Sequence, residues 1–268
     1  MNCQVDVIVI GDSKEGHEAL YKIASSGPAI KIAFISREFK SNTTHDFLNV
    51  EYIKDEVVFL DYKNRLFGCY LRGGDRLYCT HLIIATGLKY APLVINDKEV
   101  PNVFYTAEDI AKNAKDQPAI VIGSHNSDAK FALDVAKKHK HVYLCTEKLK
   151  LDKLTQSNAK KLSETKNLVI LPNTSVQKVT ISENTLRSVD LTNYSTVTCS
   201  AIYVKTEATP EVSFVPTCLI QKDPTKHLKV ANNAESLIVP KCFAIGNCAC
   251  KSTKRMQQLM VDTILTDF

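Results

Sequence analysis

Two cysteines in the last part of the chain stand at a spacing that could support thiol chemistry. Cys248 and Cys250 flank a single alanine, and cationic side chains follow at positions 251, 254 and 255. Lysine, arginine and helix N-termini stabilise thiolates, so the pair is a candidate redox centre. The alternative is a partly buried pair of small side chains, because a disulfide within CxC closes only a strained ring. A metal site that adds Cys242 lacks a fourth ligand.

Two apolar segments run into glycine-containing turns that could bind nucleotide phosphates. They cover residues 5–16 (VDVIVIGDSKEG) and 119–128 (AIVIGSHNSD). In such a turn the first glycine permits the bend, the second lets a pyrophosphate approach backbone N–H groups, and the third lets the helix pack on the strand. Gly11 and Gly16 keep the first and third roles, whereas Ser13 takes the second. The alternative is that this turn only caps a helix on a parallel sheet.

The elements around these turns alternate between strand and helix. The first turn lies in a βαβ unit with strands over 5–10 and 30–35, and the second turn starts a similar series that includes a polar helix over about 150–164. Residues 212–247 then return to the first series. We therefore expect an α/β protein with two Rossmann-like dinucleotide-binding lobes of the three-layer ββα type, the second inserted into the first.

The expected lobes follow from where the chain leaves and rejoins the first series. The first lobe is discontinuous and comprises residues 1–95 and 212–268. The second comprises residues 96–211. Prolines at positions 92 and 101 punctuate the linker between them.

Composition excludes several classes of protein. The net charge of +5 comes without a dense block of basic and aromatic residues, so no nucleic-acid partner is expected. No apolar run approaches the ~20 residues that cross a bilayer, so we expect a soluble cytoplasmic protein without a membrane partner. Nine cysteines without a CxxC pair indicate reduced thiols.

Three segments in this order resemble the flavin-binding lobe of the pyridine nucleotide–disulfide reductase superfamily, in its thioredoxin reductase branch. They are the glycine turn at 11–16, the strand end Ala85-Thr86-Gly87, and the run Phe243-Ala-Ile-Gly-Asn247. The resemblance implies FAD as cofactor and a homodimer. The branch carries a redox CxxC ahead of the second lobe, and residues 88–122 contain no cysteine.

The resemblance also implies which residues hold FAD. Ser36 stands where relatives have the acid for the ribose hydroxyls, with Glu38 as a substitute two residues later, and Asn247 replaces the aspartate that holds the ribityl chain. An amide still hydrogen-bonds a hydroxyl, without the strength of a carboxylate. Lys254 and its neighbours fall at a helix start beside the isoalloxazine ring, where cations stabilise reduced flavin. The implied set is Gly11, Asp12, Ser13, Gly16, Ser36, Arg37, Glu38, Val57, Ala85, Thr86, Gly87, Gly246, Asn247, Lys254, Arg255 and Met256.

The second lobe departs from the family pattern at the positions that would hold NAD(P)H. His125 occupies the central glycine position and blocks the pyrophosphate, and Asp128 at the first helical turn repels it. Thr146-Glu-Lys148 replaces the basic trio for a 2′-phosphate, and Glu207 stands at an expected glycine. Ordinary NAD(P)H binding is therefore not expected.

Three functional hypotheses remain open, and the sequence does not decide whether the protein is an enzyme. The leading one is an FAD-binding, oxidoreductase-like flavoprotein that takes electrons from a protein donor such as ferredoxin, with Cys248 and Cys250 auxiliary at most. The second is a catalytically inactive member that serves as a binding or scaffolding module. The third is an NAD(P)H-dependent flavin reductase, which requires His125 to swing aside.

Overall fold

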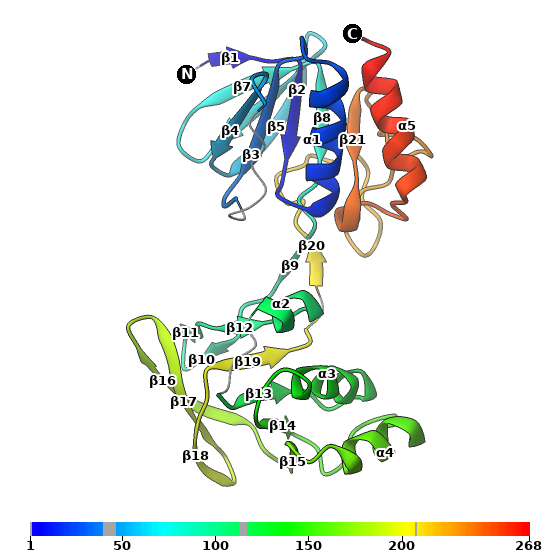
Figure 1. Cartoon of the computed structure of the whole chain (residues 1–268). Coiled ribbons are helices and arrows are strands. Elements are labelled where there is room, and N and C mark those ends of the chain that lie inside the picture. The colour runs from blue at the N-terminus through cyan, green and yellow to red at the C-terminus, as the bar shows by residue number, and fades with distance from the viewer. Residues whose placement is uncertain (1, 40–46, 113–116, 207) are drawn as a thin grey trace. The chain divides into compact units, whose positions relative to one another are not determined.

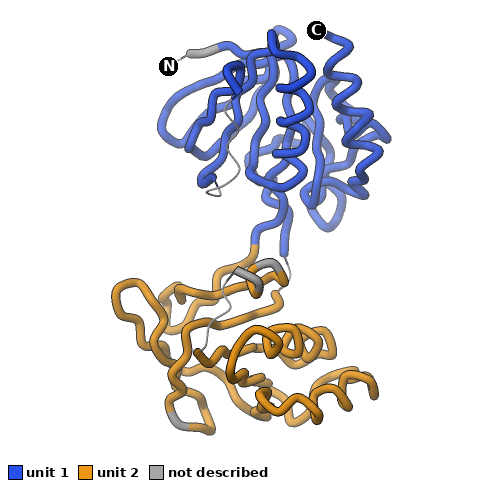
Figure 2. The backbone as a smooth tube through the Cα atoms, in the orientation of Figure 1, with its two compact units in different colours: residues 1–89, 208–268 blue, residues 90–207 orange. Residues whose placement is uncertain are grey.

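The computed structural model describes residues 2–39, 47–112, 117–206 and 208–268. The chain divides into two compact units, Met1–Lys89 with Ala208–Phe268 and Tyr90–Glu207 (Figure 2). Each unit contains a parallel five-stranded sheet, which confirms the expected α/β class. Strands β9 (Leu88–Tyr90) and β20 (Ala208–Pro210), where the chain passes from one unit to the other, pair with each other.

The first unit is built on a parallel sheet in the order β21-β8-β2-β3-β4 (Figure 1). Because the sheet is covered on both faces, its central strands are continuous apolar runs rather than alternating ones. All four residues of β2 and of β8 are buried. The strands are β2 (Val7–Ile10), β3 (Ile32–Ser36), β4 (Val50–Lys54), β8 (His81–Ile84) and β21 (Cys242–Ala244).

Helices cover one face of this sheet and a second sheet covers the other. Val7 and Val9 point toward helices α1 (Lys14–Ser26) and α5 (Lys254–Leu265), while Ile8 and Ile10 point toward the four-stranded sheet. This alternation follows from the two-residue period of a strand and produces the expected ββα layers. The second sheet has the order β1-β7-β6-β5, with β1 (Asn2–Gln4), β5 (Val57–Lys63), β6 (Leu66–Leu71) and β7 (Arg76–Cys79).

The second unit repeats the layered arrangement with a parallel sheet in the order β12-β19-β13-β14-β15. The sheet strands are β12 (Val103–Phe104), β13 (Ala119–Ile122), β14 (Val142–Thr146), β15 (Leu168–Pro172) and β19 (Ala201–Val204). Helices α2 (Ala107–Lys112), α3 (Asn126–Ala136) and α4 (Gln156–Glu164) contribute to the core on one face.

The other face of the second sheet packs on an antiparallel sheet of β16 (Val176–Ser182), β17 (Thr185–Leu191) and β18 (Tyr194–Thr198). A small hairpin, β10 (Val94–Ile95) with β11 (Lys98–Glu99), completes the described strands. The polar helix expected over about 150–164 begins only at Gln156, so the expected start of this helix is wrong. Residues 150–155 instead form the connection that precedes α4.

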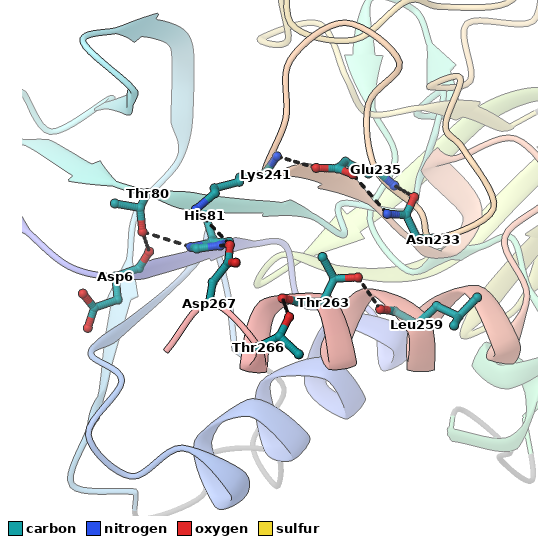
Figure 3. Close-up of polar contacts among 10 residues, drawn as sticks. All are labelled: Asp6, Thr80, His81, Asn233, Glu235, Lys241, Leu259, Thr263, Thr266 and Asp267. Carbon is teal, nitrogen blue, oxygen red and sulfur yellow. Dashed lines mark hydrogen bonds and ion pairs between the residues drawn. The ribbon is translucent and has the colours of Figure 1, made fainter.

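The end of α5 is tied to the start of β8 by a buried histidine (Figure 3). The ring of His81 lies between Thr80 and Asp267: Nε2 is 2.9 Å from Asp267 Oδ2 and Nδ1 is 2.9 Å from Thr80 Oγ1. Lys241 Nζ lies 2.8 Å from the same carboxylate. Burial lowers the pKa of His81, and the hydrogen bond from Lys241 and then that from His81 lower the pKa of Asp267. These contacts anchor the helix whose other end faces the candidate site.

Candidate cofactor site

The first glycine turn brings the ends of β2 and β8 into direct contact. Gly11 has a φ of +106°, and a Cβ on it would lie 2.5 Å from the Ala85 carbonyl oxygen. A Cβ on Gly16 would lie 2.8 Å from the Gly11 oxygen and 3.0 Å from the Ala85 Cβ. Both positions therefore require glycine for backbone packing. This is the tight bend and the close helix–strand approach that dinucleotide turns use.

Ser13 is the N-cap of α1, and its Oγ accepts a hydrogen bond from the Gly16 N–H at 3.1 Å. The cap satisfies one of the donors that a helix start leaves open. The N–H groups of Lys14 and Glu15 precede the first intrahelical bonds and remain available to an anion at this end. Serine thus supports the helix and leaves part of the phosphate-binding backbone in place.

Glu15 is the residue that the sequence reasoning missed. A Cβ on Gly246, which has a φ of +73°, would lie 3.0 Å from Glu15 Oε2, so the carboxylate packs against that glycine. An acid in the first helical turn also interacts favourably with the helix dipole. The carboxylate therefore occupies the space between the start of α1 and Gly246. The sequence signal that could have identified Glu15 is its position inside the glycine turn.

Asp12 and His17 form a pair at the same end of α1. The Asp12 carboxylate contacts His17 Nε2, and both side chains are largely buried. The His17 ring also packs edge-on against Phe34 of β3, with ring centroids 4.8 Å apart. Asp12 therefore anchors the turn to a residue of the helix that follows it.

The end of β3 carries the two candidate ribose-binding residues, half-buried Ser36 and exposed Glu38, with Arg37 between them. Ser36 Oγ donates a hydrogen bond to the Glu38 carbonyl at 2.8 Å, and this bond stabilises the turn that follows β3. The Glu38 side chain is exposed. Arg37 forms an ion pair with Glu211. The structure thus brings Ser36, Arg37 and Glu38 together at this strand end.

The end of β8 is held by the segment that returns from the second unit. Thr86 Oγ1 donates to the Glu211 carbonyl at 2.7 Å, and the Glu211 N–H donates to the Gly87 carbonyl at 3.2 Å. Gly87 has a φ of +70°, and a Cβ there would meet no atom within 4 Å. Open space therefore lies in front of Gly87, next to the buried Ala85.

The start of α5 carries exposed cations. Thr253 caps the helix by accepting from the Met256 N–H at 3.3 Å, and Met256 packs on the core beneath. Lys254 and Arg255 are exposed at the first turn. Asn247 is also exposed, one residue after Gly246, whose N–H donates to Ser252 Oγ at 2.9 Å.

Val57 is the first residue of β5, two residues after Asp55, whose N–H donates to the Ser36 carbonyl at 3.0 Å. It is 5% exposed and belongs to the core between the two sheets of the first unit. Its side chain therefore contributes to packing in this structure.

Cys248 is a buried thiol. Its Sγ lies 3.2 Å from the Ile245 carbonyl and 3.5 Å from the Ile84 carbonyl. Burial raises its pKa, which disfavours the thiolate that redox chemistry requires.

Cys250 is partly exposed, and its Sγ lies 3.1 Å from Asp223 Oδ2. Burial and this carboxylate raise the pKa of Cys250, whereas the hydrogen bond from the thiol, with others, lowers the pKa of Asp223 to about 2. The ionised carboxylate therefore keeps the Cys250 proton on sulfur at neutral pH.

The glycine turn of the second unit is filled by its own side chains. A Cβ on Gly123 would overlap the side chain of Asp128, which is buried. Asp128 Oδ2 accepts from the His125 N–H at 2.9 Å. The carboxylate thus takes a backbone donor at the start of α3 that a phosphate would use.

The connection before α4 covers the same turn. The Asn126 N–H donates to the Asp152 carbonyl at 2.9 Å, and the Asp152 N–H donates to the Ser124 carbonyl at 2.7 Å. Lys148 forms an ion pair with Asp152, which lowers the pKa of that acid. Residues 148–155 therefore lie along the start of α3 and occupy the approach to it.

A model of the pyridine nucleotide-disulphide oxidoreductase family matches residues 48–246, well over half of the chain. The chain belongs to this family. The expectation from the three quoted segments is thereby confirmed at the level of the family. A search of curated proteins finds no match.

Solved thioredoxin reductases share the fold of this family member. The enzyme from Streptococcus pyogenes MGAS5005 superposes with a TM-score of 0.68 at 17% identity, covering 100% of both chains. That from T. acidophilum gives a TM-score of 0.66 at 14% identity, covering 98% of both. That from Lactococcus lactis gives 0.65 at 16%, covering 98% of this chain and 100% of the other. These likenesses confirm the thioredoxin reductase-like arrangement of the fold.

None of the helices in the described part of the chain is long and apolar enough to cross a membrane.

Proposed function

We propose that this family member binds FAD in its first unit and does not take NAD(P)H in its second. The contrast between the two glycine turns carries the proposal. In the first unit the backbone cradle is retained, with open space at Gly87 and helix donors at the start of α1. In the second unit Asp128 and the connection before α4 take the corresponding donors.

The backbone of the first glycine turn could hold a dinucleotide. The N–H groups of Lys14 and Glu15 would hold the pyrophosphate, and Asn247 would hydrogen-bond the ribityl hydroxyls. Lys254 and Arg255 at the start of α5 would stabilise negative charge on the ring system. The fit requires the flexible Glu15 side chain to leave Gly246. When bound, FAD supplies electron transfer, and the protein supplies orientation and electrostatics.

We further propose that electrons reach this unit from a protein donor such as a ferredoxin. Two features support a protein donor: the second glycine turn is filled, and the chain has no CxxC pair to form a dithiol relay. Cys248 and Cys250 are poor relays as well, because their surroundings raise both pKa values.

A binding module without nucleotide is the second candidate, and one observation favours it. Ser13 takes the Gly16 N–H and the Glu15 carboxylate takes the space at Gly246, so the chain's own side chains occupy part of the anion site. In that case the turn serves only to pack α1 on the sheet.

The absorbance spectrum of the purified protein separates the two candidates. Stoichiometric flavin, identified as FAD after denaturation, supports the first. A colourless protein that also fails to take up added FAD contradicts the first and leaves the binding module. Addition of NADPH to the FAD-loaded protein should leave the flavin absorbance unchanged, whereas a chemical reductant should bleach it.

A further inference from the structure

An ion pair joins two strand ends at the edge of the first unit's parallel sheet. Arg37 follows directly after β3, and its guanidinium pairs with the Glu211 carboxylate. Glu211 is itself fixed to the end of β8 through the Thr86 hydroxyl and the Gly87 carbonyl, at 2.7 and 3.2 Å. The ends of strands β3 and β8 therefore fix the position of this ion pair.

The strand order places the pair across the first glycine turn. β2 lies between β3 and β8, and the three strands are parallel, so Gly11 at the end of β2 lies between the two anchor points. With neighbouring strands about 4.8 Å apart, the anchors are roughly 10 Å apart. An arginine and a glutamate side chain span that gap together. Ligands of parallel sheets bind in this crevice, outside the carboxyl ends of the strands.

The charges of the pair suit an exchange with a phosphorylated ligand. Arginine binds phosphate and carboxylate with the same forked geometry, so a phosphate can replace Glu211 on Arg37. The Arg37 side chain is 47% exposed, whereas the Glu211 side chain is 19% exposed. Solvent screens the arginine, and pairs between exposed side chains contribute only about 0–1 kcal/mol. The guanidinium can therefore turn to a phosphate that replaces the carboxylate.

We propose that Arg37 and Glu211 form a clasp that closes the crevice at the end of β2 and that a dinucleotide opens it by taking the place of Glu211 on Arg37. This regulation rests on the proposed function, because it assumes that the crevice receives FAD. Glu211→Gln removes the charge and keeps the backbone bonds to Thr86 and Gly87. Glu183→Gln is the matched control, since Glu183 pairs with a different arginine, Arg187, at 3.9 Å in the second unit.

The closed state is measured without any cofactor by the rate at which phenylglyoxal modifies Arg37, read by mass spectrometry. Exposed Arg255 serves as the internal reference. In the unmodified sequence Arg37 should react more slowly than Arg255, and Glu211→Gln should speed Arg37 about fivefold or more. Glu183→Gln should leave the Arg37 rate unchanged. Equal Arg37 rates with and without Glu211 overturn the clasp, whether or not FAD binds.

The exchange is measured by stopped-flow mixing of the three apoproteins with FAD. Glu211→Gln should raise the association rate constant about tenfold, and Glu183→Gln should leave it unchanged. Equal association rates in all three overturn the gating role while the proposed function stands. If none of the three proteins binds FAD, the proposed function and the exchange both fail. Faster phenylglyoxal modification of Arg37 in Glu211→Gln would then support only the closed ion pair.

Discussion

Single residues of the first glycine turn are constrained by two separate demands. Gly11 and Gly16 are needed because any Cβ would strike the neighbouring backbone or Ala85, with or without a ligand. A glycine at position 13 is required only by a ligand, and there the chain carries serine, which caps α1. The strand–helix packing therefore requires the first and third glycines even without a cofactor. Whether a cofactor binds therefore depends on Ser13 and Glu15.

Gly11→Ala should destabilise the first unit by more than about 2 kcal/mol, because it combines a positive φ with a backbone overlap. The control is Gly74→Ala, where φ is +96° but a Cβ meets no atom within 4 Å. Urea unfolding of both variants isolates the overlap. Equal losses would contradict the close approach of the β2 and β8 ends.

Glu15→Gln should tighten FAD binding roughly tenfold, about 1.4 kcal/mol, because it removes a negative charge from the place of the pyrophosphate. Glu18→Gln is the matched control, since Glu18 lies one turn further along α1 and pairs with Lys14 at 3.9 Å. Fluorescence titration with FAD gives both affinities. An unchanged affinity in Glu15→Gln would show that the carboxylate lies clear of the bound dinucleotide.

Thiol reactivity should follow burial. Cys218 is exposed, Cys250 is held by Asp223, and Cys248 is buried with a raised pKa. At pH 8 iodoacetamide should label Cys218 first, Cys250 more slowly, and Cys248 only on unfolding. Mass spectrometry of timed samples reads the order. Labelling of Cys248 at the rate of Cys218 would restore it as a redox candidate.

Elements in this fold are tied at their ends, and α5 shows this most clearly. Thr253 caps its start, and the His81–Asp267 contact holds its end against β8. Position 81 reads as an ordinary strand start in the sequence. Only the pairing of β8 with β2 and the packing of α5 bring Asp267, 186 positions away, to the imidazole.

This contact predicts acid sensitivity. Because the folded pKa of His81 is lowered, the unfolded chain binds protons more readily as pH falls through the ordinary histidine value near 6.5, and stability falls with it. Asp267, whose pKa is also lowered, adds a further loss below about pH 4. His81→Gln should therefore reduce the loss of unfolding free energy between pH 7.5 and 5.5.

His81→Gln should reduce this loss of unfolding free energy by up to about 1.4 kcal/mol for each unit by which the folded and unfolded pKa values of His81 differ. Urea unfolding at the two pH values measures it. His141→Gln, at an exposed position, is the control and should follow the unaltered protein. If His81→Gln loses as much stability on acidification as that control, the titrating group is another one.

At the scale of the whole molecule, two units with the same strand–turn–helix start differ in what occupies the turn. The first turn faces open space at Gly87, and the second holds Asp128 and the segment before α4. Each unit keeps the packing of a dinucleotide-binding fold, because that packing also forms its core. Fold alone therefore leaves the ligand of each unit undecided.

The filled second turn predicts no NADPH binding by the intact chain at millimolar concentration. The physical reason is that the α3 donors are already satisfied, by the Asp128 carboxylate and the Asp152 carbonyl. Titration that follows NADPH fluorescence measures it, with a thioredoxin reductase as positive control. Saturable binding would mean that residues 148–155 can move away from the turn.

Patterns within a few residues determined much of this protein. The apolar runs at 5–10, 82–85 and 119–122 specified buried parallel strands, and the glycine turns specified where each helix follows. The quoted segments were enough to recognise the family, which the match over residues 48–246 confirms. These features are readable because strand and helix periodicity and the steric demands of turns act over short stretches of chain.

Only the tertiary structure decided what stands at the ends of those strands. Glu15 against Gly246, Arg37 with Glu211, and Asp152 over the start of α3 each join parts of the chain that no local pattern relates. The sequence showed that Asp128 and His125 oppose a nucleotide, but it did not show that residues 148–155 cover the turn. Side-chain charges act through space, so their partners are set by the sheet order that brings distant strand ends together.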